Sequence, residues 1–175
     1  TQEYMQSQAR GGLSCRDFIE VHLAEVRSIA ERVSRTDIEI FLRFLYEAWA
    51  NDKQVFIAGN GGSASTATHF AADLNKFTCV EGKKRYRAIA LTDNMPTVTA
   101  ITNDLGWENL FVEQLMNLMR KGDTLVVITV HGGSGGDQAG LWSQNLLRAA
   151  KYVQDNDGIV LGLAGFDGGA LRQIA

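Results

Sequence analysis

The sequence has few of the residues that build disulfide frameworks or metal clusters. It contains only two cysteines, Cys15 and Cys79, among 175 residues. Their separation matches no metal-binding spacing, and a single pair is too little for a disulfide scaffold. Low cysteine content of this kind fits a reducing compartment, so we expect a cytoplasmic protein.

The sequence also lacks an excess of basic charge and a long apolar run. A net charge of −3 provides no broad positive field for binding nucleic acid. The one basic cluster, Lys83-Lys84-Arg85, is typical of a solvated loop rather than of a phosphate clamp. No run of about 18 apolar residues is present, and residues 1–12 lack the apolar centre of a signal peptide. We therefore expect neither a membrane span nor direct contact with nucleic acid.

What the sequence does contain is enough apolar material for one domain. Its hydrophobic fraction of 45% over 175 residues is typical of a globular chain with a real core. We expect a flexible N-terminus over residues 1–14 and a single domain over residues 15–175. Because the chain stops in the middle of a pattern, we also expect that a C-terminal strand and helix of this domain are missing.

Two helices precede any strand, and strands then alternate with helices. Helical spacing predicts helices over residues 16–33 and from about 36 to 51, with Thr36 or Asp37 as a possible cap. Their apolar faces need a cover, either the sheet or another subunit. Short apolar runs predict strands at 54–58, 87–91, 124–130 and 158–164; helices are expected at 63–77, 95–102, 107–120, 141–155 and 170–175. This order predicts an α/β fold with a parallel sheet covered on both faces.

A glycine-rich turn after the first strand is the main functional signal. Residues 55–74 are typical of a buried strand, a turn with three glycines, and the start of a helix. Backbone N–H groups and the helix dipole make such a turn suitable for an anion, and Ser63 adds a hydroxyl. The turn also satisfies the loose dinucleotide fingerprint G-x-G-x-x-A, but the acidic residue that fingerprint needs, Asp93, comes too late. We therefore favour a phosphorylated small molecule.

Two further glycine-rich turns follow the third and fourth predicted strands. All three turns should lie at the carboxyl edge of the sheet, where open α/β sheets bind ligands. The alternative is that these glycines only permit tight turns. For the third turn, at residues 165–169, the two interpretations remain equally open.

Several ordered motifs resemble one known family. Gly59-Asn60-Gly61-Gly62-Ser63, the segment from His69 to Leu74, and the segments 87–93, 102–107, 121–123 and 165–169 are similar to the sugar isomerase (SIS) domain, in its phosphoheptose isomerase group. The resemblance runs from about residue 16 to the end of the chain. It implies a three-layer α/β/α sandwich around a doubly wound, five-stranded parallel sheet, here preceded by two N-terminal helices. It also implies a homotetramer that binds sugar phosphates.

The resemblance assigns a set of substrate-binding residues. Asn60, Gly61, Gly62 and Ser63 line the substrate, and Asn103 and Asp104 hold sugar hydroxyls or shape the pocket. The family's phosphate loop corresponds to the segment that contains Thr129, Val130, His131 and Ser134. Val130 and His131 depart from its serine- and threonine-rich pattern, and His131 could equally be a solvated loop residue. About ten extra residues, near 135–144, could form a lid or change specificity.

Two residues on the helix after the first glycine turn could carry acid–base chemistry. His69 and Asp73 are four positions apart and therefore share a helix face. Interconversion of a ketose and an aldose needs a base near the carbon acid and an acid near the carbonyl oxygen. In the family these positions carry a histidine and a glutamate, which contribute to a zinc site in some members. His69 and Asp73 are therefore candidate catalytic residues and possible zinc ligands, although two ligands alone do not make a metal site. His69 could instead simply pack its ring against the sheet.

These features lead to one main hypothesis and one alternative. The main hypothesis is a phosphosugar isomerase that converts sedoheptulose 7-phosphate, or a related ketose phosphate, to an aldose phosphate through an enediol. It depends on Asp73, which is one methylene shorter than the family's glutamate, and on a histidine of the family's last helix that lies beyond this chain. The alternative is a non-catalytic SIS protein that binds a phosphosugar or serves as an adaptor in replication initiation.

Overall fold

The computed structural model describes residue 12 and residues 14–133 and 142–175, which divide between two compact units, Thr1–Ile40 and Phe41–Ala175. In the first unit, α2 (Cys15–Arg32) is capped by the Ser14 hydroxyl, which accepts a hydrogen bond from the Asp17 N–H at 3.2 Å. α2 buries none of its residues. The next helix, α3 (Arg35–Ala50), begins earlier than expected, because the Ser34 hydroxyl rather than Thr36 or Asp37 accepts from the first turn.

The second unit is built on a parallel sheet with four strands in its described residues. These are β1 (Gln54–Gly59), β2 (Arg87–Ala90), β3 (Thr124–Thr129) and β4 (Ile159–Ala164), in the order β2-β1-β3-β4. All four predicted strands are confirmed to within a residue at each end. Ile57 of β1 is level with Ala90 on one side and Val126 on the other. The carboxyl ends of the strands therefore lie along one edge.

The helices between the strands agree with prediction except near Gly106 and at the C-terminal end. They are α4 (Gly62–Lys76), α5 (Met95–Leu105), the 3-10 turn η1 (Trp107–Asn109), α6 (Leu110–Leu118), α7 (Gln144–Asp155) and the 3-10 turn η2 (Gly169–Gln173). α5 continues past residue 102 and ends at Gly106, whose φ of 90° breaks the helix. The expected helix at 170–175 is only the short turn η2, a correction to the sequence prediction.

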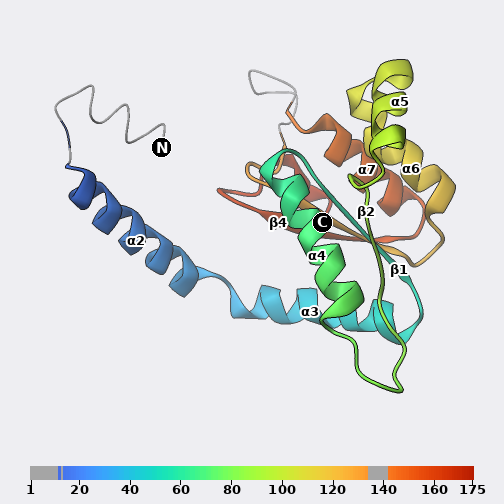
Figure 1. Cartoon of the computed structure of the whole chain (residues 1–175), viewed down its shortest axis with the longest axis horizontal. Helices are drawn as coiled ribbons and strands as arrows, with labels where there is room; N and C mark the ends of the chain where they lie inside the picture. Colours follow the sequence, from blue (N-terminus) through green and yellow to red (C-terminus); the bar gives the residue numbers. More distant parts are fainter. Residues whose placement is uncertain (1–11, 13, 134–141) are drawn as a thin grey trace. The chain divides into compact units, whose positions relative to one another are not determined.

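Two apolar cores, one on each face of the sheet, form the second unit. One joins Phe56 and Leu125 to Leu115 of α6 and Ala149 of α7. The other joins Ile57 and Val126 to Ala67 of α4 and to the end of α3. Because alternate residues of each strand point to opposite faces, every strand contributes to a core. This confirms the three-layer α/β/α architecture, with α4 on one face and α6 and α7 on the other (Figure 1).

The order of the strands identifies where a ligand crevice should lie. The chain leaves β1 through α4 on one face, whereas it leaves the neighbouring strand β3 through α7 on the other face. Open doubly wound sheets bind ligands at this switch point, outside the carboxyl ends of the strands. Separately, none of the helices in the described residues combines the length and apolarity needed to cross a bilayer.

Candidate functional site

The turn after β1 is a backbone structure that only glycine permits. A Cβ on Gly59 would lie 2.5 Å from the carbonyl oxygen of Ser63. Gly61 has a φ of 56° and precedes the first residue of α4. No side chain caps this helix and no acidic residue occupies its first turn. The start of α4 is therefore suited to an anionic ligand, as the sequence predicts.

A buried pair of asparagines connects this turn to α7. The amide groups of Asn60 and Asn145 hydrogen-bond to each other in both directions, at 2.9 Å each. Asn145 has no exposed surface, and its side-chain oxygen also accepts from the Leu146 N–H at 2.9 Å. Sequence reasoning missed Asn145, because nothing local pairs two residues that are 85 positions apart. The pair links the elements that follow β1 and β3 at the switch point.

A pocket of about 230 Å³ lies at the end of β3, and we call it the β3 pocket. Its lining residues are Asn60, Ser63, Ile128, Thr129, Val130, His131, Trp142, Ser143 and Leu146. Thr129 is only 9% exposed, and it adds a hydroxyl to the lining of the pocket. Ser143 precedes α7, which has no side-chain cap and no acidic residue in its first turn. The pocket thus collects hydroxyls and the starts of two helices, a combination that favours an anion.

His69 and Asp73 lie one helical turn apart on α4. The His69 Nε2 and Asp73 Oδ2 atoms are 3.5 Å apart, with side chains 77% and 43% exposed. Both line a cavity of about 530 Å³, the β4 cavity, with Ser65, Thr66, Phe70, Ile128 and Leu163. An exposed pair of this kind contributes little to stability. The structure therefore brings the two predicted catalytic residues together and leaves them accessible to a ligand.

A zinc site is not completed by the residues that the structure describes. Within residues 14–133 and 142–175, no group of three histidine, cysteine or acidic side chains converges on one point. His69 and Asp73 supply two donors, whereas a zinc site needs at least three from the protein. We therefore assign no catalytic step to a metal ion.

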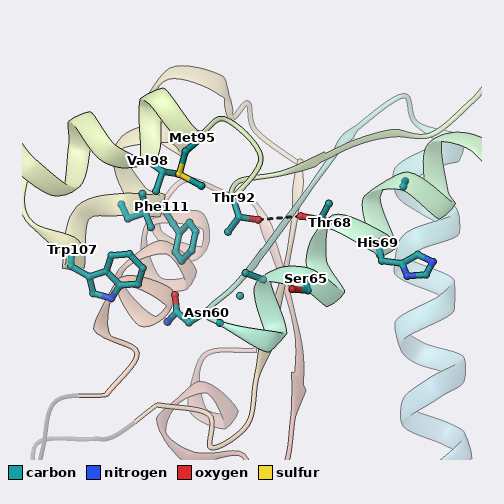
Figure 2. A pocket seen from close by; sticks show the side chains of 14 residues that line it. Asn60, Ser65, Thr68, His69, Thr92, Met95, Val98, Trp107 and Phe111 are labelled. Atoms are coloured by element: carbon teal, nitrogen blue, oxygen red, sulfur yellow. Dashed lines mark hydrogen bonds between the residues drawn. The ribbon is translucent and has the colours of Figure 1, made fainter.

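A third cavity, of about 590 Å³, lies between α4 and the α5–α6 segment, and we call it the α5 cavity. One side is polar, with Asn60, Ser65, Thr68 and Thr92, and the other is an apolar wall of Met95, Val98, Trp107, Leu110 and Phe111 (Figure 2). The Thr68 hydroxyl donates to Asp93 at 2.6 Å and lies 3.4 Å from the Thr92 hydroxyl. The His69 ring points away from Trp107 and Phe111 (Figure 2). The apolar wall gave no signal in the sequence beyond helical apolar spacing.

The three cavities surround the first turns of α4. The α5 cavity shares Asn60 with the β3 pocket and His69 with the β4 cavity, and the last two share Ile128. An anion-binding pocket, a larger binding space and an acid–base pair are therefore contiguous. Such an arrangement can hold a phosphorylated molecule at one end and move a proton at the other.

Asn103 and Asp104 do not line any of these three cavities. They lie on the exposed last turn of α5, where the Asn103 side chain donates to Asp104 at 2.7 Å. Their role in binding sugar hydroxyls stays a prediction. Ser134 and most of the insertion near 135–144 lie outside the described residues.

The third glycine turn, at residues 165–169, packs against the second. The N–H groups of Ala170 and Leu171 donate to the carbonyls of Gly133 and Gly132, at 3.2 Å and 2.8 Å. A Cβ on Gly132 would lie 1.8 Å from the Gly168 oxygen, so the two backbones touch directly. This contact supports the structural interpretation of these glycines that the sequence left open, because they allow the two loops to pack directly against each other.

The chain is similar in sequence to known proteins of one family. The SIS domain family profile matches residues 21–165. The lincomycin biosynthesis protein LmbN of Streptomyces lincolnensis is 41% identical over 133 residues, which is 76% of this chain and 47% of that protein. A phosphoheptose isomerase of Helicobacter hepaticus is 39% identical over 130 residues, 74% of this chain and 61% of its own length. The chain thus spans between about half and two-thirds of these relatives.

A solved structure extends the likeness to three dimensions. The phosphoheptose isomerase of Neisseria gonorrhoeae superposes with a TM-score of 0.78 at 30% identity, covering 92% of this chain and 80% of that one. The sequence motifs and the sheet topology agree with these matches. The chain therefore belongs to the SIS domain family, in its phosphoheptose isomerase group.

Proposed function

We propose that this chain is a phosphosugar isomerase that converts sedoheptulose 7-phosphate, or a related ketose phosphate, to the aldose phosphate. The observation that carries the proposal is that α4 borders both an anion-suited pocket and an acid–base pair. Ser63 lines the β3 pocket and His69 the β4 cavity. The rise between them is about 9 Å along the helix, comparable with the extended length of a seven-carbon sugar phosphate. A reducing, cytoplasmic location is part of this proposal.

The phosphate group occupies the β3 pocket in this proposal. The Ser63 and Thr129 hydroxyls donate to its oxygens, together with N–H groups at the start of α4 near Gly61 and Gly62. The buried Asn145 amide holds Asn60 beside them. The carbon chain extends toward His69, and Asn103 and Asp104 stay assigned to sugar hydroxyls by family resemblance alone.

Proton transfer occurs at the other end, with Asp73 as the base. Its carboxylate takes the proton from C1 of the ketose while the C2 carbonyl oxygen gains a proton, which forms the enediol. Return of a proton to C2 and loss of the proton on O1 complete the aldose. His69, 3.5 Å from Asp73, orients the carboxylate or passes the oxygen-bound proton. The shorter reach of aspartate costs about 100-fold in rate if nothing compensates.

Turnover of sedoheptulose 7-phosphate, followed by NMR, tests this proposal with the Asp73→Asn variant. We expect the variant to lose at least about 100-fold of the rate, because the carboxylate that accepts the proton is gone. Asp155→Asn is the matched control, because Asp155 is also in an exposed i,i+4 ion pair, with Lys151 on α7. Equal rates for wild type and Asp73→Asn would show that the base is assigned wrongly.

The alternative function is phosphosugar binding without catalysis, including an adaptor role in replication initiation. It is favoured by the open exposure of His69 and Asp73 and by the replacement of phosphate-loop hydroxyls by Val130 and His131. Calorimetry with sugar phosphates separates the two functions when run beside the NMR assay. Binding with no turnover of any ketose phosphate supports the alternative. Absence of binding excludes both the isomerase and phosphosugar binding, and it favours a pure adaptor.

We also propose that a second copy of this chain covers the apolar face of α2, within a homotetramer. Ile19, Val26 and Ile29 of this helix are each at least half exposed. Monomeric soluble proteins rarely expose large contiguous apolar patches, and such patches mark interaction sites. Light scattering on Val26→Asp tests this, and Ser28→Asp adds the same charge to the polar side of α2 as a control. We expect only Val26→Asp to lower the oligomer mass; unchanged mass would contradict the proposal.

A further inference from the structure

The His131 ring, which lines the β3 pocket together with Trp142, contacts two other aromatic rings. The His131 ring lies nearly parallel to Phe166, with centroids 4.5 Å apart and an interplanar angle of 17°. Trp142 contacts His131 at 5.8 Å and 48°. The three residues come from separate segments, namely the turn after β3, the approach to α7 and the turn after β4. We call this group the aromatic clamp.

The placement of Phe166 is not explained by burial. Its side chain is 82% exposed, and its φ is 53°, a conformation that a bulky residue rarely adopts. The surrounding turn imposes this conformation through the Gly165 N–H, which donates to the Val130 carbonyl at 3.0 Å. Strained residues of this kind persist where the surrounding structure requires them, and they cluster at ligand sites.

Among the described residues that line the β3 pocket, His131 is the only side chain that can become a cation. Thr129, nine-tenths buried, lines the same pocket. On the adjoining turn after β4, the charged groups are Asp167 and Arg172, and Arg172 Nη1 donates to the Asp167 carbonyl at 3.4 Å. The first turns of α4 and α7 carry no acidic residue.

We propose that His131, in contact with Phe166 and Trp142, is the phosphate-binding cation of this chain and replaces the hydroxyls missing from the family's phosphate loop. The inference rests on the proposed function for the identity of the ligand. Its chemical basis is that aromatic faces stabilise an adjacent imidazolium, and that an imidazolium makes a charge-assisted hydrogen bond to a phosphate oxygen. Anion affinity at the β3 pocket therefore falls as pH rises and the imidazole loses its proton.

Sulfate is the probe that tests the charge of His131 directly, since sulfate stays a dianion throughout the titration range of histidine. Calorimetry on the full chain should show sulfate affinity falling about tenfold between about pH 5.5 and pH 8.5. The His131→Asn variant should bind weakly and equally at both pH values. In the NMR spectrum of the wild type, sulfate should shift the His131 ring signals at low pH.

Variants of neighbouring residues test the clamp itself. Phe166→Leu should weaken low-pH sulfate binding about threefold, because the imidazolium loses a ring face. Phe77→Leu is the matched control, since Phe77 is 81% exposed and lines none of the three cavities. In Asp167→Asn, the pH dependence should persist; its loss would assign the titration to that carboxylate and overturn the proposal.

The outcomes separate this inference from the proposed function. A pH-independent sulfate affinity in the wild type, or an unchanged pH dependence in His131→Asn, overturns the role of His131 even if the enzyme turns over sugar phosphates. A pH-dependent affinity that requires His131, in a protein that isomerises no sugar phosphate, supports the anion site and overturns the proposed isomerase.

Discussion

The two ends of the candidate site differ in how strongly the chain holds them. At the β3 pocket, Asn60 is held by a fully buried asparagine through two hydrogen bonds of 2.9 Å. At the β4 cavity, the His69 Nε2 and Asp73 Oδ2 atoms are 3.5 Å apart, and the two side chains are 77% and 43% exposed. The first end is rigid and partly dry, whereas the second is open to water.

From this difference we infer which of two steps, ligand binding or proton abstraction, one copy of the described unit can perform. Binding needs fixed donors, and the β3 pocket has them. Proton abstraction from carbon needs a base that is positioned and shielded from water. Exposed side chains on a single helix face do not by themselves meet that need. The predictions below change one end and measure both.

The largest effect is expected at the open end, from Asp73→Glu. The longer side chain restores the family's residue and moves the carboxylate toward the substrate, which should raise turnover by up to about 100-fold. Sulfate affinity at the β3 pocket should stay unchanged. NMR turnover and calorimetry measure the two quantities, with Asp155→Glu as the control. Slower turnover in Asp73→Glu would mean that the cavity is shaped for aspartate. The replacement of the family's glutamate by Asp73 would then reflect a different substrate.

A smaller effect, on both stability and binding, is expected at the rigid end from Asn145→Leu. The change leaves the Asn60 amide and the Leu146 N–H without their buried partner, which should cost about 2–3 kcal/mol of unfolding free energy. Because Asn60 loses its orientation, sugar phosphate affinity should fall about tenfold although residue 145 lines none of the three cavities. Urea unfolding and calorimetry check the two effects.

The control for Asn145→Leu is Asn117→Leu on α6. Asn117 is exposed and bonds only to the Glu113 carbonyl of its own helix, at 3.2 Å. Its replacement should change the free energy of unfolding by less than about 0.5 kcal/mol. If Asn145→Leu loses stability but keeps full affinity, the asparagine pair only supports the fold and does not position Asn60.

The same contrast explains what sequence reasoning could and could not predict. Strands that end in glycine are visible locally, so β1, β3 and β4 and the anion-suited turn at Gly59–Gly62 were predictable. His69 and Asp73 were predictable as a pair, because helical spacing alone places them on one face. Asn145 and Phe166 were not predictable, since each acquires its role from a loop that is distant in the sequence. The end of α5 was misplaced because the conformation of Gly106, rather than apolar spacing, terminates it.

The smallest effect is expected from Thr129→Val, which removes one hydroxyl from the rigid end. Thr129 is only 9% exposed, and the loss of its single hydroxyl should change the free energy of unfolding by no more than about 1 kcal/mol. Sulfate affinity should fall about fivefold, because the bound anion loses a hydrogen bond. Denaturant unfolding and calorimetry measure the two changes.

The opposite end of the same strand supplies the control for this prediction. Thr124 begins β3, is fully buried, and has an unpartnered hydroxyl among the described residues, but it lies away from the β3 pocket. Thr124→Val removes the same group from the strand and should leave sulfate affinity as it is. Equal affinities for the two variants would mean that the Thr129 hydroxyl does not contact the anion. A selective loss in Thr129→Val would mean that its hydroxyl donates a hydrogen bond to the bound anion.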